Sequence, residues 1–517
     1  MAADPDALTG TYYLGHFEGL LAQVQGRYGD LFTAGEQQLL AGFAALPEDG
    51  RALYVRFLGR SGQCFREDKL RYPELDLGLA LTSLAGAGFI KEATPSHQHL
   101  ALLTKADLAR FFALNERLAR PDLLAAAQAL PMPPLLFRLW QSEHEGFFRR
   151  CLLLYFGNAY QDLSEFVTTT LAHVRYETYS LDPKIRFYRD RAHLERHYHL
   201  SELAKTLDKS EDHELLSLGA QWPEGKDLRW QRLTLALARR LERMGESAQA
   251  LGWYQRLTLP PARERAVRLL ANTEGDHAAW LALQPLLAQP QDASEQDFIE
   301  GFGQRLARKL GQPWPLAPLG SIAERTLALP QGQDSVEQKA LGYFEAGMHS
   351  ENQLLTGLFG LLFWDIIFAP VPGAFFHPFQ RGPADLFGPD FVARRQEAIA
   401  ARLAEVAQGW LPRAQATLAA KKGLANYLVH WPFWTQAHLA LASHIPGEQL
   451  AAWFGFLLKD LRHHRSGFPD LLVLDGGQYK LVEVKGPGDR LQPGQKRWLR
   501  ALSRLSCPAE VLHLKRH

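Results

Sequence analysis

The chain has 517 residues, a length that predicts several structural domains at about 100–200 residues each. Hydrophobic residues make up 46% and charged residues 22%, which excludes a mainly disordered protein. The net charge is +1, so a surface for a strongly charged partner must be local. Three widely spaced cysteines argue against a disulfide framework and a structural zinc site, and they fit a reducing compartment.

No targeting or membrane segment is expected. The first residues lack the basic and apolar stretches of a secretory signal. The longest apolar run, 359–368, is interrupted by Asp365 and reaches about half a membrane span. We therefore expect a soluble, intracellular protein without a membrane partner.

Residues 1–72 are expected to form a helical region that binds DNA. Apolar residues recur at spacings of three and four over residues 11–45. Residues 51–71 then combine six basic residues with Tyr54, Phe57 and Phe65, a mixture that can follow a phosphate backbone. The alternative, which the spacing alone favours, is a solvated helix face. On the first interpretation, Arg56 and Arg60 contact DNA.

The next two regions are also expected to be helical. Residues 73–130 resemble a small DNA-binding module of the SAP type, and Thr104 to Asp107 has the form of a helix capping box. Residues 131–345 resemble a degenerate tetratricopeptide (TPR-like) array, although no clean 34-residue period is present.

Histidine spacing does not favour zinc. His193 and His197 are four residues apart and can share one helix face. The zinc-protease motif requires a glutamate directly after the first histidine, where this chain has Leu194.

Near residue 468 the hydrophobic period changes from 3.6 to 2. An apolar run, 471–474, is followed by Asp475-Gly476-Gly477-Gln478, which predicts a two-residue hairpin turn. The return strand covers 479–485, a helix begins near Pro493, and a last strand covers 510–514. The predicted order is therefore strand, strand, helix, strand.

The hairpin register brings two acidic residues together. If Asp475 pairs with Gln478, Asp470 lies opposite Glu483, and directly opposed Cβ atoms are about 4.5–5.5 Å apart. Lys485 emerges on the same face as Glu483. One interpretation is a salt-bridge cluster. The other is a divalent metal held by both carboxylates, and such a ligand set suits Mg²⁺ or Mn²⁺.

These residues carry a resemblance to a known family. Pro469-Asp470, followed by Glu483-Val484-Lys485, matches the PD-(D/E)xK motif of restriction-endonuclease-like nucleases. The wider string from Arg462 to Leu491 resembles the virus-type replication-repair (VRR) nuclease domain and, more narrowly, the Fanconi-associated nuclease family. Similar strings begin at Tyr12, Leu53 and Leu361. The resemblance is to bacterial-type members, which lack the ubiquitin-binding zinc finger.

The resemblance implies a fold and an activity. The fold is mainly α and multi-domain, with helical N-terminal and TPR-like domains before a C-terminal restriction-endonuclease-like α/β nuclease domain over 346–517, whose core motif is 460–517. The activity is cleavage of branched and 5′-flap DNA as an endonuclease and 5′ exonuclease in interstrand crosslink repair. The implied location is the cytoplasm, with the nucleoid in a bacterium, or the nucleus in a eukaryote. Protein partners remain unknown.

The resemblance also implies roles for individual residues. Asp470, Glu483, an upstream acid and the Val484 carbonyl hold Mg²⁺ or Mn²⁺, as two ions, and Lys485 orients or deprotonates the attacking water. The upstream acid corresponds to Glu351, with Glu397 and Glu405 as rivals. Basic and polar residues around the motif are expected to contact DNA: Arg462, Arg465, Arg490, Gln495 and Lys496.

Two other functions are compatible with the motif. One is a Holliday-junction resolvase or restriction-type endonuclease built on the same core. The other is a non-catalytic helical-repeat scaffold, which the intact set of Asp470, Glu483 and Lys485 disfavours.

Overall fold

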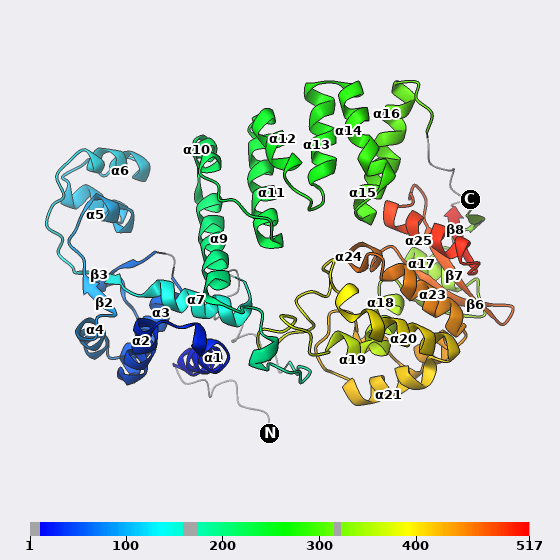
Figure 1. Ribbon diagram of the computed structural model, residues 1–517, viewed down its shortest axis with the longest axis horizontal. Helices are drawn as coiled ribbons and strands as arrows, with labels where there is room; N and C mark the ends of the chain where they lie inside the picture. The colour runs from blue at the N-terminus through cyan, green and yellow to red at the C-terminus, as the bar shows by residue number, and fades with distance from the viewer. Residues whose placement is uncertain (1–10, 61, 159–173, 315–321, 516–517) are drawn as a thin grey trace. The chain divides into compact units, whose positions relative to one another are not determined.

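The computed structural model describes residues 11–60, 62–158, 174–314 and 322–515 (Figure 1). The chain forms two compact units. The first consists of Met1–Val174 with Leu181–Tyr198, and the second of Arg175–Ser180 with His199–His517. Within the described ranges, no helix is long and apolar enough to cross a membrane.

The first unit packs its helices around an aromatic core. Phe148 contacts the rings of Phe17 and Tyr54, with centroids 6.0 and 5.2 Å apart, and a small antiparallel sheet has the strand order β1-β3-β2. The elements of this unit are α1 (Tyr12–Tyr28), α2 (Ala34–Ala45), α3 (Glu48–Leu58), β1 (Cys64–Arg66), α4 (Leu77–Gly86), β2 (Ile90–Glu92), α5 (Lys105–Phe111), α6 (Arg120–Gln128), β3 (Leu139–Ser142), α7 (Glu145–Phe156) and the start of α9 (Arg191–Lys209).

The capping box predicted at Thr104 is confirmed. The Thr104 side chain accepts a hydrogen bond from the Asp107 N–H, and the Asp107 carboxylate accepts one from the Thr104 N–H. Helices α5 and α6 bury a small apolar core of their own, which includes Leu108 and Leu123. The SAP-like character of residues 73–130 stays a prediction.

A row of helices opens the second unit (Figure 1). α11 packs on α12, α12 on α13 and α13 on α14, as expected for a helical array. Its TPR-like character stays a prediction, and two strands, β3 and β4, lie inside the range 131–345 that was expected to be helical. The helices are α10 (Leu215–Ala220), α11 (Leu228–Arg243), α12 (Ser247–Gln255), α13 (Ala262–Thr273), α14 (Asp276–Ala288), α15 (Ala293–Phe298) and α16 (Gln304–Lys309).

A five-stranded mixed sheet forms the C-terminal core, with the order β4-β8-β7-β6-β5. The strands are β4 (Ala323–Ala328), β5 (Ala346–His349), β6 (Leu471–Asp475), β7 (Gln478–Lys485) and β8 (Ala509–Lys515). The predicted order of strand, strand, helix and strand is confirmed by β6, β7, α25 (Pro493–Arg504) and β8. The edge strands β4 and β5 were not predicted.

The predicted hairpin register is confirmed. Asp475 pairs with Gln478 and Leu471 with Val482. Gly476 and Gly477 have φ angles of 61° and 73°, which a type I′ turn requires and which glycine adopts without strain. Asp470 lies directly before the first paired residue, at the end of the hairpin away from the turn.

Both faces of the sheet are covered, which explains the continuous apolar run in β6. Val473, Val482 and Leu512 pack on one face with residues of α17. On the other face Phe468 contacts Trp453 and Trp498, from α23 and α25. The remaining helices of this region are α17 (Val336–Leu341), α18 (Leu354–Leu362), α19 (Trp364–Ile367), α20 (Gln396–Gln408), α21 (Leu411–Lys421), α22 (Gln436–Ala442), α23 (Gly447–Leu457) and α24 (Leu461–His464).

Polar contacts join the helical array to the nuclease core. The Ala293 N–H donates to the Asp460 carboxylate at 2.9 Å. Arg500 of α25 pairs with Glu300 at 2.7 Å, and Arg497 pairs with Asp297. These contacts with the helical array therefore help to stabilise the nuclease core.

A fragment that covers residues 380–517 should not fold. It lacks β4, β5, α17 and α18, so both edges of the remaining sheet and one of its apolar faces would be exposed to water. We expect no cooperative thermal transition by circular dichroism, whereas residues 175–517, which hold the whole second unit, should unfold cooperatively. Cooperative unfolding of the short fragment would contradict this account of the core.

Candidate functional site

Asp470 is fixed at the start of the β6–β7 hairpin. The residue is only 7% exposed, and its Oδ2 accepts a hydrogen bond from the Val484 N–H at 2.8 Å. This bond orients the carboxylate across the hairpin toward β7. The Val484 N–H therefore contacts Asp470. The proposed role of the Val484 carbonyl as a metal ligand stays a prediction.

Glu483 lies next to Asp470 and is completely buried, with 0% of its surface exposed. Among the described residues, no donor makes a hydrogen bond of normal geometry to either of its carboxylate oxygens. The Lys485 ammonium nevertheless lies 2.6 Å from Oε1, so we treat this contact as an ion pair. Lys485 is itself 7% exposed, and the three motif residues therefore form a buried group.

The protonation of both carboxyl groups is shifted by their surroundings. Burial is the main cause that raises the pKa of Glu483 to about 8, and the nearby Asp470 charge adds to it, while Lys485 opposes the shift. Burial also raises the pKa of Asp470, against the Val484 hydrogen bond and Lys485. Two acids in a poorly solvated site with one ammonium are unstable as anions unless a further cation is present.

Glu351 is brought to this pair by the main chain. β5 runs antiparallel to β6, with His349 opposite Leu471. The N–H groups of Ser350 and Glu351 then donate to the Asp470 carbonyl at 2.7 and 3.2 Å. Asn352, with a φ of 54°, turns the chain into α18 and donates to Glu351 Oε1 at 3.0 Å.

The two rival acids are not part of this group. Glu397 is exposed on α20, and Glu405 is paired with Arg402 and Arg413. The placement of Glu351 beside Asp470 favours it as the upstream acid.

His349 was not predicted and lies in the same group. One of its ring nitrogens, a Glu351 carboxylate oxygen and an Asp470 carboxylate oxygen are all within 4.8 Å of one another. The only sequence signal was its position two residues before Glu351, just beyond the end of β5.

The donors suit a divalent cation. The group consists of carboxylate oxygens and one imidazole nitrogen, without a thiolate, and the buried Glu483 oxygens lack normal hydrogen bonds. A divalent cation would compensate the excess of negative charge that Lys485 leaves.

The predicted DNA contacts around the motif lie at the surface. Arg462, Arg465, Arg490 and Lys496 are exposed, and the Arg465 guanidinium lies 4.3 Å from the centre of the Phe387 ring. Gln495 has a structural role, because its Oε1 accepts a hydrogen bond from the Gln492 N–H at the start of α25.

The basic stretch 51–71 is partly neutralised inside the first unit. Arg51 pairs with Glu18, and the buried Arg66 pairs with Asp68 and Asp107. Arg56 pairs with Glu74 at 3.1 Å and lies over the Tyr13 ring. Arg60 is exposed and lies over Tyr72, so both solvated and DNA-contacting roles are compatible with its position.

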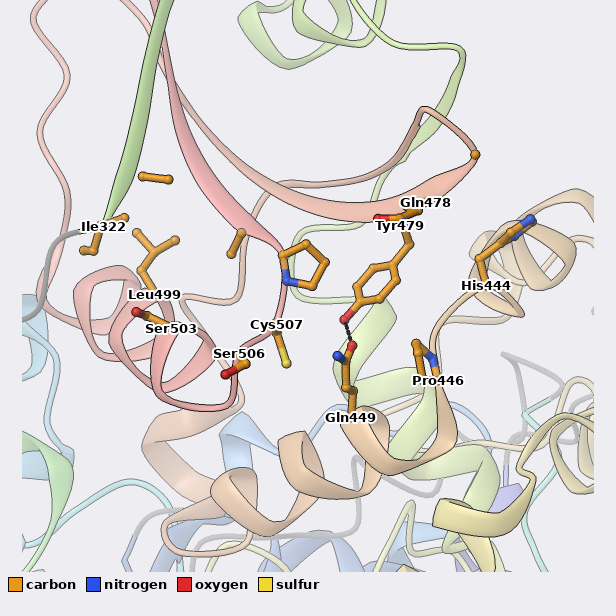
Figure 2. Close-up of a pocket in the computed structure, with 14 residues that line it drawn as sticks. Ile322, His444, Pro446, Gln449, Gln478, Tyr479, Leu499, Ser503, Ser506 and Cys507 are labelled. Atoms are coloured by element: carbon orange, nitrogen blue, oxygen red, sulfur yellow. Dashed lines mark hydrogen bonds between the residues drawn. The ribbon is translucent and has the colours of Figure 1, made fainter.

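One recess of the nuclease core lies elsewhere. A pocket of about 740 Å³ is lined by Tyr479, Gln449, His444 and Cys507, among others (Figure 2). Tyr479 and Gln478 stand beside the hairpin turn, at the opposite end of β7 from Lys485, and none of the predicted site residues lines the pocket. The candidate site therefore lies at the other end of β7 from this pocket.

The chain resembles known protein families and known proteins over most of its length. A model of the VRR-NUC domain matches residues 408–515, and a model described as the FAN1 HTH domain matches residues 11–91. The chain is 34% identical to the Fanconi-associated nuclease 1 homolog of Pseudomonas aeruginosa, over 98% of this chain and 96% of that protein. It is 27% identical to the Arabidopsis thaliana homolog, over 98% of this chain and 67% of that protein.

A solved structure has the same fold. It is a crystal structure of paFAN1 bound to a 2-nucleotide 5′-flap DNA with a gap, with a TM-score of 0.83 and 33% sequence identity. The match covers 100% of both chains.

Replacing Asp470 by Asn should stabilise the chain in EDTA. Because the pKa of Asp470 is raised, its ionised form costs folding free energy once the pH exceeds the usual carboxyl pKa. The amide still accepts the Val484 hydrogen bond without the charge. We expect a gain of about 1 kcal/mol in the free energy of unfolding at pH 8, measured by urea denaturation. The gain should shrink as the pH falls and the wild-type carboxyl becomes protonated.

The matched control is Asp475→Asn in the same strand. Asp475 is exposed and pairs with Lys480, which lowers its pKa, so its replacement should give no gain. A loss of stability in Asp470→Asn at pH 8 would contradict the proposed electrostatic cost.

Proposed function

Because the chain belongs to the Fanconi-associated nuclease family, we propose that it hydrolyses phosphodiester bonds of branched DNA near 5′ flaps. The observation that carries this proposal is the buried group of Asp470, Glu483 and Lys485, with Glu351 held beside it by main-chain hydrogen bonds. The DNA in the related paFAN1 crystal structure is a 5′ flap. The cellular role that fits this activity is interstrand crosslink repair.

Asp470, Glu483, Glu351 and the Val484 carbonyl are the proposed ligands of Mg²⁺ or Mn²⁺, bound as two ions. When bound, the cations stabilise negative charge on the phosphate and lower the pKa of a coordinated water. The Val484 N–H keeps the Asp470 carboxylate in one orientation, so this ligand is positioned before DNA binds.

Lys485 is proposed to hold the attacking water. Its ammonium is anchored by Glu483 at 2.6 Å, which limits its motion and keeps a cation beside the reacting phosphate. From this position the ammonium can donate a hydrogen bond that orients the water, and the neutral amine could instead accept a proton from it. An ammonium is also suited to neutralise charge that develops on the phosphate in the transition state.

The exposed cations near the motif are proposed to hold the DNA backbone. Arg462, Arg465, Arg490 and Lys496 flank the acidic strands and can pair with phosphates on either side of the cut. Gln495 already caps α25, so its contribution to DNA binding would be limited to its amide nitrogen.

Asp470→Asn, Glu483→Gln and Lys485→Ala should each slow cleavage of 5′-flap DNA by about a hundredfold or more. The first two remove a carboxylate ligand, and the third removes the group that positions the water. Binding of the flap in EDTA, measured by fluorescence anisotropy, should stay close to that of the wild type. Normal turnover of the two acid variants with Mg²⁺ would refute the mechanism.

The choice of substrate separates this proposal from a resolvase or a restriction-type endonuclease. Under matched conditions a 5′ flap should be cut faster than a Holliday junction or a plain duplex. Preferred cutting of the junction would support the resolvase instead.

Glu351→Gln should lose cleavage to a similar degree, because Glu351 lies next to Asp470. The matched control is Glu397→Gln, an exposed acid on α20 that should leave the rate unchanged. Initial rates on a 5′ flap at saturating DNA test the pair. Equal rates for both variants would show that Glu351 is not a metal ligand.

The basic stretch of the first unit is tested by Arg56→Gln combined with Arg60→Gln. Each lost phosphate contact should reduce the slope of log affinity against log salt by roughly one unit. The control is Arg305→Gln with Arg308→Gln, two exposed arginines of α16 that belong to no motif. An unchanged slope in the first variant would make this stretch a solvated surface.

A further inference from the structure

His349 stands at the end of β5 with its side chain toward the acidic group. Its Nε2 lies 3.7 Å from Glu351 Oε2, and both side chains are about half exposed. Together with a carboxylate oxygen of Asp470, the three ligand atoms lie within 4.8 Å of one another.

The main chain fixes this arrangement. His349 is paired with Leu471, the residue directly after Asp470. The two residues after His349 donate their N–H groups to the Asp470 carbonyl. Because both side chains are short and their backbones are paired, the distance between the imidazole and the Asp470 carboxylate can vary little.

A second observation points to a cation beside this group, although Glu483 is not one of its three members. Glu483 is fully buried, and no described residue makes a hydrogen bond of normal geometry to its carboxylate. The charge of Asp470 acts on Glu483, and the charge of Glu351 acts on both. Three carboxylates thus share one ammonium, that of Lys485.

We propose that His349 is a metal ligand that binds the same divalent cation as Glu351 and Asp470. This inference rests on the proposed function, since it concerns the same metal site. Two ligands on opposite sides of an ion with bonds of about 2.1 Å lie about 4.2 Å apart. The three ligand atoms all lie within 4.8 Å of one another, so one cation can contact all three after small side-chain movements.

An imidazole ligand changes which ion the site prefers. Mg²⁺ takes oxygen ligands and keeps its waters, whereas imidazole nitrogen adds affinity for first-row transition ions. His349 therefore makes the site favour an ion such as Mn²⁺ over Mg²⁺.

The test uses the full chain loaded with Mn²⁺. Electron spin echo modulation from a directly bound ¹⁴N reports an imidazole ligand, and a merely structural histidine gives none. We expect the signal in the wild type and its loss in His349→Ala and His349→Gln. Calorimetry should show Mn²⁺ affinity reduced about tenfold in both variants, with a smaller change for Mg²⁺.

His444→Ala is the matched control. His444 is an exposed histidine of the same unit, remote from the motif, so its replacement should leave the ¹⁴N signal and the Mn²⁺ affinity unchanged. Far-ultraviolet circular dichroism establishes that each variant is folded. His349 lies at a sheet edge and is half exposed, so both of its substitutions should fold.

The possible failures are distinguishable. A wild type without the ¹⁴N signal, or a His349→Ala variant that keeps both signal and affinity, overturns the role of His349. Asp470→Asn tests the metal site itself. If that variant binds Mn²⁺ as tightly as the wild type, the proposed metal site is wrong, and this inference is overturned with it.

Discussion

Glu483 has no exposed surface and lies beside a second buried carboxyl group, with Lys485 as its nearest cation. Burial of a charged group costs free energy that other parts of the fold must supply. Here the two apolar faces of the sheet, with Val482 and Leu512 on one side and Phe468 with Trp498 on the other, supply it. The acidic strand end is thus stable only as part of a thick, well-packed core.

Much of the hairpin was predictable from the sequence, because its signals are local. Alternation with period 2 located β7, and the paired glycines fixed the turn and hence every partner in the register. The buried strand β6 was recognisable as a continuous apolar run between turn residues. These features require no knowledge of distant residues.

The rest of the site depends on pairing between distant segments. β5 has four residues, two of them exposed glycine and alanine, and β4 is also mostly polar or small, so neither shows a strand pattern. Glu351 was found through the family resemblance, and His349 was missed, because their closeness to Asp470 arises only when β5 pairs with β6. The charge count of residues 51–71 likewise did not reveal that Glu18, Glu74 and Asp107 would pair with its arginines.

The hydrogen bonds from Ser350 to Asp470 join residues that are 120 positions apart. Such contacts have high contact order and form late, because the intervening chain must first be ordered. A nascent chain in which Asp470 has not yet left the ribosome contains Glu351 and His349 but not the rest of the acidic group. A chain whose intervening helices are still unfolded has all of these residues, but they are not yet close together. The acidic group is therefore complete only when β5 pairs with β6 and the intervening chain is folded.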